Sequence, residues 1–336
     1  MVDSWLPTMN AEGTISERIL EQTCDRYGVL SKHLVFVGGI ENAIYSYEKD
    51  NQTFFLRFGH SSHMTLDLVT AEIDWLVYLI DKEVPAVKPA KSENGSYIER
   101  IDTGKDSYNV VAFERAEGEH LDFRDPFSWT DSVIRDWGRV IGRMHSVTKD
   151  YKHKSTKRYE FQPELDLHLI RDNAKARENI ADLFQRMHEL PKSRESYGLV
   201  HSDIHAGNFF VKDNRISAIL DFDRACYKWF ISELAVFLYY PLYITEMRSN
   251  PNKQREYASR VFPIFWEGYA AENHLDPSWL EHLDLFMQVR DAILFMYLPP
   301  SVSKDVRMRF GRRILGEDSY TDFEFCIPDC QGSDSF

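Results

Sequence analysis

The octapeptide HSDIHAGN at residues 201–208, followed by ILDFD at residues 219–223, is the most informative part of the chain. It contains an aspartate (Asp203), an asparagine after four spacers (Asn208) and an aspartate that ends an apolar run (Asp221). Phosphoryl transfer from a nucleotide uses such groups. One carboxylate orients and deprotonates the attacking hydroxyl, while an amide and a second carboxylate hold magnesium on the phosphates. The pattern therefore predicts a nucleotide-dependent phosphotransferase.

The segment between the two motifs is typical of a β-hairpin. Residues 209–211 and 216–220 are rich in apolar strand formers and flank a polar turn. A hairpin brings its outer ends together, so Asn208 and Asp221 are expected at the same end, with Asp203 just upstream. Oxygen ligands grouped in this way suit Mg²⁺, which completes its octahedron with phosphate and water.

Three other interpretations use the same residues. His201, Asp203 and His205 form an H-x-D-x-H pattern that could chelate zinc, although further ligands are not evident nearby. Asp221 and Asp223 form a D-x-D pattern that could belong to a phosphatase with an aspartyl-phosphate, which leaves the upstream cluster unexplained. The third is a polar loop packed on a core. The phosphotransferase interpretation accounts for the whole ordered set.

These motifs resemble the H-G-D-x-H-x-x-N loop and the I-D-[FW]-[DE] motif of the aminoglycoside phosphotransferase and choline kinase-like family, relatives of protein kinases. The resemblance implies that Asp203 is the catalytic base and that Asn208 and Asp221 are metal ligands. It implies that His201 orders the loop. Asp223 is a second acid that either orders the loop or reaches a metal.

Three further positions bear on the structure of the loop. His205 either contacts the substrate or braces the loop, and bracing is favoured. Ser202 replaces the usual glycine of the family motif, and Glu233, in the segment SELA, replaces the aspartate of Tyr-Asp-Leu-Ala. The structural role of that carboxylate is therefore open at the level of sequence.

The resemblance implies an α+β, protein-kinase-like fold with two lobes. Residues 1–116 would form a small nucleotide-binding lobe, with a five-stranded antiparallel sheet plus a helix at residues 65–81. Residues 117–336 would form a larger, mainly helical lobe with the catalytic loop and the acceptor site. The expected strands are residues 34–37, 43–47, 53–58, 97–101 and 108–113.

The first lobe contains candidate phosphate-binding residues. Gly38 and Gly39 would let backbone amides approach phosphates without a Cβ in the way, although most Gly-Gly pairs are ordinary turns. The resemblance places Arg57 at the family's phosphate-binding cation and Glu72 at the helix residue that pairs with it. The alternatives are an outward-facing strand arginine and a solvated helix glutamate.

Residues 114–118, ERAEG, resemble the hinge between the lobes, where backbone groups near Glu114 and Ala116 would meet the adenine edge. We expect ATP as the donor, with GTP as the alternative.

Beyond the hinge, apolar residues recur at helical spacing and predict packing helices rather than binding elements. His145, at the end of the first of them, is expected to be a helix-end residue. The predicted helical runs are residues 133–144, 165–190, 234–243, 261–269 and 283–298, the last of them stopped by Pro299.

Bulk composition limits the partners and the compartment. The chain has 336 residues, 43% of them hydrophobic, and carries 40 Lys+Arg against 53 Asp+Glu, a net charge of −13. This acidity argues against nucleic-acid binding and favours a cationic hydroxyl acceptor such as an amino sugar or amino alcohol. Glu267, Asp284 and Asp291 would either line the acceptor site or be surface charges, and the latter is favoured.

Targeting signals and a disulfide framework are not evident. Residues 1–10 lack a signal pattern, and the longest apolar run is too short to cross a bilayer, so no membrane partner is expected. The four cysteines are widely spaced apart from Cys326 and Cys330, which would be incidental, a tail disulfide or a metal clip. The expected compartment is the cytoplasm.

We therefore predict a small-molecule kinase that uses ATP and Mg²⁺ and phosphorylates a hydroxyl. Two alternatives remain at this level: a Ser/Thr protein kinase of the same fold, and a non-catalytic nucleotide-binding protein.

Overall fold

The computed structural model describes residues 15–39, 42–154, 156–171, 173–297 and 310–321. The chain divides into two compact units. The first unit comprises Met1–Glu117, Tyr151–Arg158 and Ala218–Asp223, and the second comprises Gly118–Asp150, Tyr159–Ser217 and Arg224–Phe336. The proposed lobe boundary at residues 116 and 117 stays a prediction.

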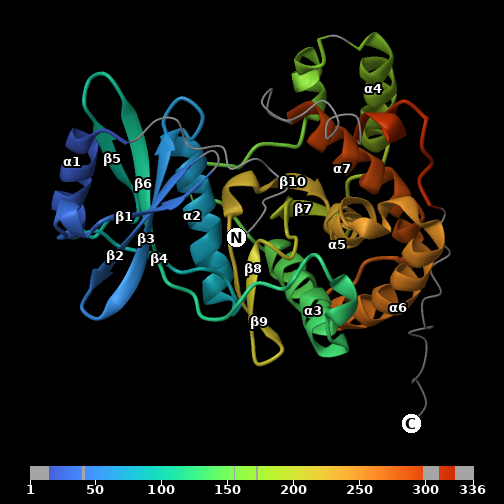
Figure 1. Ribbon diagram of the computed structural model, residues 1–336, viewed down its shortest axis with the longest axis horizontal. Helices are drawn as coiled ribbons and strands as arrows, with labels where there is room; N and C mark the ends of the chain where they lie inside the picture. The colour runs from blue at the N-terminus through green and yellow to red at the C-terminus, as the bar shows by residue number, and fades with distance from the viewer. Residues whose placement is uncertain (1–14, 40–41, 155, 172, 298–309, 322–336) are drawn as a thin grey trace. The chain divides into compact units, whose positions relative to one another are not determined.

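The first unit is built on a six-stranded antiparallel sheet with the order β1-β2-β3-β6-β4, in which β5 also pairs with β6 (Figure 1). The β2–β3 hairpin turns at Asp50 and Asn51, whose φ angles of 51° and 61° are those of the tight turns that match strand twist. The strands are β1 (Val35–Gly38), β2 (Ala43–Lys49), β3 (Gln52–His60), β4 (Pro89–Ala90), β5 (Glu99–Asp102) and β6 (Ser107–Glu114).

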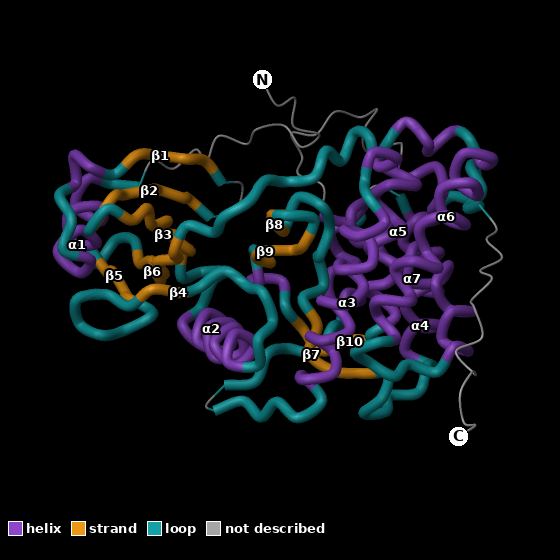
Figure 2. Tube along the Cα trace, turned by 90° about the horizontal axis from the view of Figure 1, so that it is seen from below, coloured by secondary structure: helices purple, strands orange, loops and turns teal. Residues whose placement is uncertain are grey.

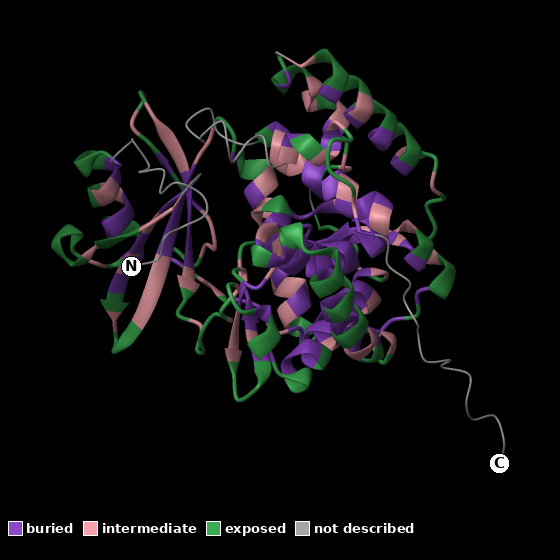
Figure 3. Cartoon of the chain, turned by 45° about the vertical axis from the view of Figure 1, so that its right-hand side comes forward, coloured by how far each residue is buried: buried purple, intermediate pink, exposed green. Residues whose placement is uncertain are grey.

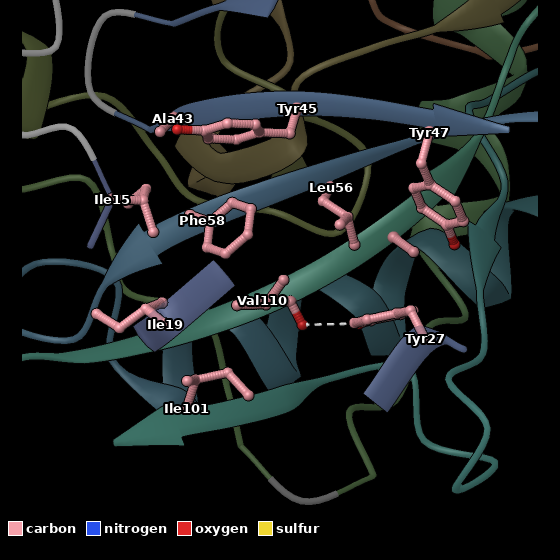
Figure 4. Packing of buried hydrophobic residues seen from close by; sticks show 11 residues of the cluster. Ile15, Ile19, Tyr27, Ala43, Tyr45, Tyr47, Leu56, Phe58, Ile101 and Val110 are labelled. Carbon is pink, nitrogen blue, oxygen red and sulfur yellow. Dashed lines mark hydrogen bonds between the residues drawn. The ribbon is translucent and has the colours of Figure 1, made fainter. Parts of the chain in front are cut away.

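The sheet lies between two helices, α1 (Glu17–Tyr27) and α2 (Leu66–Asp81), as Figures 1 and 2 show. Leu56 and Phe58 of β3 belong to a core that includes residues of α1, and the Tyr27 hydroxyl donates to the Val110 carbonyl at 3.2 Å (Figure 4). Successive strand residues point to opposite faces, so Arg57 faces α2 instead.

The second unit is mainly helical, and its buried residues lie in its centre while exposed residues lie on the outer helices (Figure 3). A close crossing joins α3 and α6, because a Cβ on Gly138 would lie 1.9 Å from the Phe265 carbonyl oxygen and one on Gly268 would lie 1.9 Å from that of Arg135. The helices are α3 (Asp131–Thr148), α4 (Ala174–His188), α5 (Ile231–Ile244), α6 (Pro251–Ala270) and α7 (Leu283–Tyr297).

Two short antiparallel pairs flank the 201–208 loop in sequence. The strand β7 (Tyr197–Val200) precedes it and pairs with β10 (Cys226–Trp229), while β8 (Phe209–Lys212) follows it and pairs with β9 (Arg215–Ile219). The predicted hairpin is therefore present.

The expected strands and helices are largely present, but β7 and β10 were not expected, and three further differences stand out. The sheet has a sixth strand, β4, which was not expected because it is two residues long and begins with proline. The helix α1 was also not expected. The predicted helical run over residues 165–190 is wrong as one element: the structure has a 3₁₀ helix at Pro163–Leu169 and a separate α4 capped by Asn173, whose side chain accepts from the Ala176 amide at 2.9 Å.

Some predictions fall outside the described residues, namely the helix stop at Pro299 and the Cys326 and Cys330 pair. Over the part of the chain that the structure describes, no helix has the length and apolarity needed to span a membrane.

Candidate active site

The 201–208 loop of the second unit is held by hydrogen bonds within itself. The Asp203 carbonyl accepts from the Asn208 side-chain amide at 2.8 Å and from the His205 amide at 3.0 Å. The Asp203 amide donates to Nδ1 of His201, a fully buried side chain, at 3.3 Å. This is the geometry that a loop-ordering role for His201 requires.

A buried carboxylate anchors the start of this loop. Ser202 has a φ of 73°, in the left-handed region that favours glycine, and its amide donates to Glu233 Oε1 at 2.7 Å. The other oxygen of Glu233 lies 2.6 Å from Nε2 of His145, whose Nδ1 lies 2.9 Å from the Tyr269 hydroxyl. Glutamate therefore fixes the loop backbone at the position where the family motif has aspartate. His145 lies in the last turn of α3, as expected, and it supports Glu233.

We expect the Glu233 contacts to appear in the acid stability of the protein. Burial alone would raise the pKa of Glu233, but its bonds to His145 and to the Ser202 amide bring the net pKa below the ordinary 4.5. A depressed pKa gives stability that is present above pH 4.5 and lost as the pH falls through the folded-state pKa. Glu233→Gln should lower the free energy of unfolding at pH 7 by about 1–3 kcal/mol. It should also make the free energy of unfolding depend less on pH in the acid range. Urea unfolding at a series of pH values measures both effects.

The control for this prediction is Glu267→Gln. Glu267 is exposed and pairs on the surface with Arg135, so its loss should cost less than about 1 kcal/mol at pH 7. If the two substitutions lowered the free energy of unfolding equally, the buried contacts of Glu233 would contribute no more to stability than a surface ion pair.

The Asp203 carboxylate is surrounded by donors from the second unit. Its Oδ1 accepts from Nη2 of Arg290 on α7 and, at 3.2 Å, from the hydroxyl of Tyr240 on α5. Nε2 of His205 lies 3.9 Å from the same oxygen. Burial would raise the pKa of Asp203, but the positive charge of Arg290, together with His205, His201 and the Tyr240 hydrogen bond, holds the net pKa below 3.8. The carboxylate is therefore ionised at neutral pH, as a proton acceptor must be.

His205 is held on two sides. Its Nδ1 accepts from the Gly207 amide at 3.0 Å, and its ring lies 4.4 Å from the Tyr240 ring, centroid to centroid. Burial lowers the pKa of His205. These contacts are those of a residue that braces the loop, and a contact with substrate stays a prediction.

In the first unit, Arg57 and Glu72 form a two-pronged ion pair between β3 and α2. Nη1 and Nη2 of Arg57 donate to the two oxygens of Glu72 at 2.7 and 2.8 Å, and the side chains are 8% and 1% exposed. Burial would lower the pKa of Arg57, but Glu72, with smaller effects of Asp223 and Asp221, raises it instead. The outward-facing and solvated alternatives for these residues are wrong.

The segment 221–223 lies in the same unit and is fixed from several sides. Asp221 has a φ of 61°, in the left-handed region that aspartate tolerates better than most residues, and Phe222 packs against Trp75 of α2 with centroids 5.6 Å apart. The Asp223 carbonyl accepts from Arg158, and its carboxylate accepts from the Asn42 side chain at 3.2 Å.

The predicted glycine turn precedes Asn42. A Cβ on Gly39 would lie 1.8 Å from the Asn42 carbonyl oxygen, and Gly39 has a φ of 127°, so only glycine fits there. Gly38 has a φ of 146°, and a Cβ added to it would meet no atom of the described residues within 4 Å. Phosphate binding by this pair stays a prediction.

Asn208 and Asp221 each offer an oxygen of the kind that magnesium binds. The Nδ2 of Asn208 is used by the Asp203 carbonyl, which leaves its Oδ1 for another partner, and Asp221 supplies a carboxylate. Asp223 is already bonded to Asn42, which favours its ordering role. Asn208 belongs to the second unit and Asp221 to the first, so their sharing of one ion stays a prediction.

The zinc interpretation finds no support in the structure. Within the described ranges, no group of three or more His, Cys, Asp or Glu side chains is placed to hold a metal ion. A magnesium ion with few protein ligands does not need such a group.

At the predicted hinge, the Glu114 amide already donates a hydrogen bond to the Lys88 carbonyl, at 2.9 Å. The Ala116 amide has no hydrogen bond within the described part of the chain. A role of either backbone in adenine binding stays a prediction.

Sequence reasoning missed Arg290, Tyr240, Asn42 and Arg158. None of them lies in a local motif, and Arg290 is 87 positions from Asp203. The interpretation of Asp291 as a surface charge is wrong, because it is fully buried and paired with Arg313 at 2.6 Å.

A family model and a relative of known name both relate this chain to phosphotransferases. A family model described as "Phosphotransferase enzyme family" matches residues 33–265. An amicoumacin kinase of Bacillus subtilis (strain 168) is 32% identical over 286 residues, which is 83% of this chain and 83% of that protein.

Two solved structures have similar folds. An amicoumacin kinase in complex with AMP-PNP, Ca²⁺ and Ami matches with a TM-score of 0.82 and 26% identity, covering 94% of this chain and 97% of that one. A microcompartment-associated aminopropanol kinase matches with a TM-score of 0.69 and 19% identity, covering 90% and 95%. The α+β, protein-kinase-like fold class predicted from the sequence is confirmed.

Proposed function

Because the chain belongs to the phosphotransferase enzyme family, we propose that it transfers the γ-phosphate of ATP to a hydroxyl of a small molecule. The observation that carries this proposal is the placement of Asp203: a carboxylate held by Arg290 and Tyr240, in a loop fixed by its own hydrogen bonds and by Glu233.

In the proposed mechanism, Asp203 orients the acceptor hydroxyl and takes its proton as the bond to phosphorus forms. Arg57, held by Glu72, neutralises charge on the phosphates with a guanidinium that is pre-organised before the nucleotide arrives. Asn208 and Asp221 would hold Mg²⁺, which supplies charge neutralisation on the phosphate oxygens.

The acceptor is proposed to be amicoumacin or an amino alcohol. Two relatives are named amicoumacin kinases and a third an aminopropanol kinase, and the net charge of −13 is compatible with a cationic acceptor. These relatives act on small molecules, which favours a small acceptor over a Ser/Thr protein substrate. The donor is proposed to be ATP rather than GTP, since AMP-PNP is an adenine nucleotide. ATP and Mg²⁺ are abundant in the cytoplasm, which we propose as the compartment.

The test is ATP consumption with Mg²⁺ by the purified chain in the presence of amicoumacin, 1-aminopropan-2-ol or an aminoglycoside, with product mass confirming phosphate transfer. We expect transfer to at least one of these and a preference for ATP over GTP. No acceptor-dependent ATP consumption with any of them, by protein that binds ATP, would refute the proposed acceptor class.

A further inference from the structure

Arg290 is a buried cation that pairs with the proposed base from a distant part of the chain. Its side chain is 9% exposed, and its Nη2 donates both to Oδ1 of Asp203 and to the Tyr240 hydroxyl. The Tyr240 hydroxyl in turn donates to the same Oδ1 at 3.2 Å. Three groups, from the loop, α5 and α7, thus form a closed triangle of hydrogen bonds.

This triangle makes the two oxygens of Asp203 unequal. Oδ1 accepts from both Arg290 and Tyr240, and His205 also lies nearest to it. Over the residues that the structure describes, no hydrogen bond reaches Oδ2. Since each carboxylate oxygen has its own acceptor capacity, Oδ2 keeps the capacity to bind a hydroxyl.

We propose that Arg290 and Tyr240 are positioning residues of the transfer: they hold Oδ1 of Asp203 and so fix Oδ2 as the oxygen that receives the proton of the acceptor. This proposal rests on the proposed function. In the step itself, the acceptor O–H bond breaks and its proton goes to Oδ2, while the acceptor oxygen bonds to the γ-phosphorus. The bond from that phosphorus to the β,γ-bridging oxygen breaks, and its electron pair stays on the ADP that leaves.

A second set of polar contacts joins α5 and α7 beside the triangle. Tyr239, the residue before Tyr240, donates to Oδ1 of Asp291 at 2.5 Å, and Asp291 directly follows Arg290. Arg313 holds the same carboxylate with bonds of 2.6 and 3.0 Å. Neighbouring residues thus make two different contacts. Tyr239 and Asp291 join α5 to α7, whereas Tyr240 and Arg290 both bind Asp203.

This arrangement provides a matched control. Arg290 and Arg313 are both arginines in ion pairs that are largely buried, but only Arg290 contacts Asp203. Replacing either arginine should lower the stability of the fold. Only the replacement of Arg290 should also disturb the position of the Asp203 carboxylate.

The experiment measures kcat and KM for ATP and for amicoumacin in Arg290→Met, Arg290→Lys, Tyr240→Phe and Arg313→Met, each normalised to folded protein. We expect Arg290→Met to lower kcat by about 10- to 100-fold, since small misplacements of a reacting group have effects of this size. Both KM values should stay within about twofold. Arg290→Lys should recover part of kcat, and Tyr240→Phe, which keeps the ring against His205, should lose less than Arg290→Met. Arg313→Met should lower the unfolding temperature but leave kcat near wild type.

Three results would overturn the proposal. Wild-type kcat in Arg290→Met would show that the pairing has no role in transfer. An unchanged kcat with a raised KM for amicoumacin would make Arg290 an acceptor-binding residue. An equal loss of kcat in Arg313→Met would make the effect structural.

A thermodynamic cycle separates this proposal from the proposed function. Arg290→Met, Asp203→Ala and the double variant are compared by urea unfolding, and coupling between the two sites is expected because Asp203→Ala removes the oxygen that accepts from Arg290. Absence of coupling refutes the pairing whether or not the wild-type chain has activity, whereas absence of any wild-type transfer refutes the proposed function.

Discussion

Asp203→Ala will bind ATP with the affinity of the wild-type chain but will transfer phosphate at a rate lower by about 10²- to 10⁴-fold, the range that a positioned general base contributes. The reason is that no second carboxylate in the 201–208 loop can replace it. Turnover is measured by ATP consumption with the accepted small molecule, and nucleotide affinity by calorimetry.

Asp203→Asn is the control for this prediction. It keeps an oxygen that can accept from Arg290 and Tyr240 but cannot take a proton, so its fold should be preserved while its turnover falls as in Asp203→Ala. Turnover near the wild-type rate in either variant would show that another group accepts the proton.

Removing Glu72 should have the largest effect on stability. Glu72→Ala leaves the Arg57 guanidinium buried without its partner, and breaking a buried ion pair in this way costs about 3–5 kcal/mol. We also expect a raised KM for ATP, since Arg57 loses the contact that orients it. Urea unfolding and steady-state kinetics measure the two effects.

The double variant Arg57→Met/Glu72→Met tests whether the pair exists for stability or for function. Two apolar side chains of similar size can replace a buried ion pair without loss of stability, so the double variant should unfold near or above the wild-type urea concentration and still lack activity. The control is Arg100→Met in the same unit, whose exposed pair with Asp102 should contribute less than about 1 kcal/mol. A double variant that is stable and fully active would exclude Arg57 from phosphate binding.

The sequence predicted those parts of the site in which the contacting residues are close together along the chain. The 201–208 loop is ordered mainly by bonds between residues two to five positions apart, which a motif records directly. The hairpin that follows turns at Asp213 and Asn214, with φ angles of 52° and 59°, and aspartate and asparagine are among the residues that tolerate that conformation best. The spacing of apolar residues likewise located α2, α3 and α5 to within a few residues.

The break inside residues 165–190 shows where this reasoning fails. Apolar periodicity is similar in a continuous amphipathic helix and in a 3₁₀ helix followed by a capped α-helix. The cap at Asn173 is a single side chain in a polar segment, and its signal was not strong enough to divide the run.

The sequence, with its resemblance to a known family, was sufficient to predict a candidate base, candidate metal ligands and the strand–helix ion pair of this phosphotransferase, because these residues belong to short motifs or to strongly patterned elements. Only the folded chain determined that Arg290 and Tyr240 hold Asp203 and that His145 supports Glu233, pairs separated by 87, 37 and 88 positions. Helical periodicity identifies which face of a helix is buried, but the packing of the helices decides which polar side chains meet there. The choice of partner is therefore a property of the assembled core.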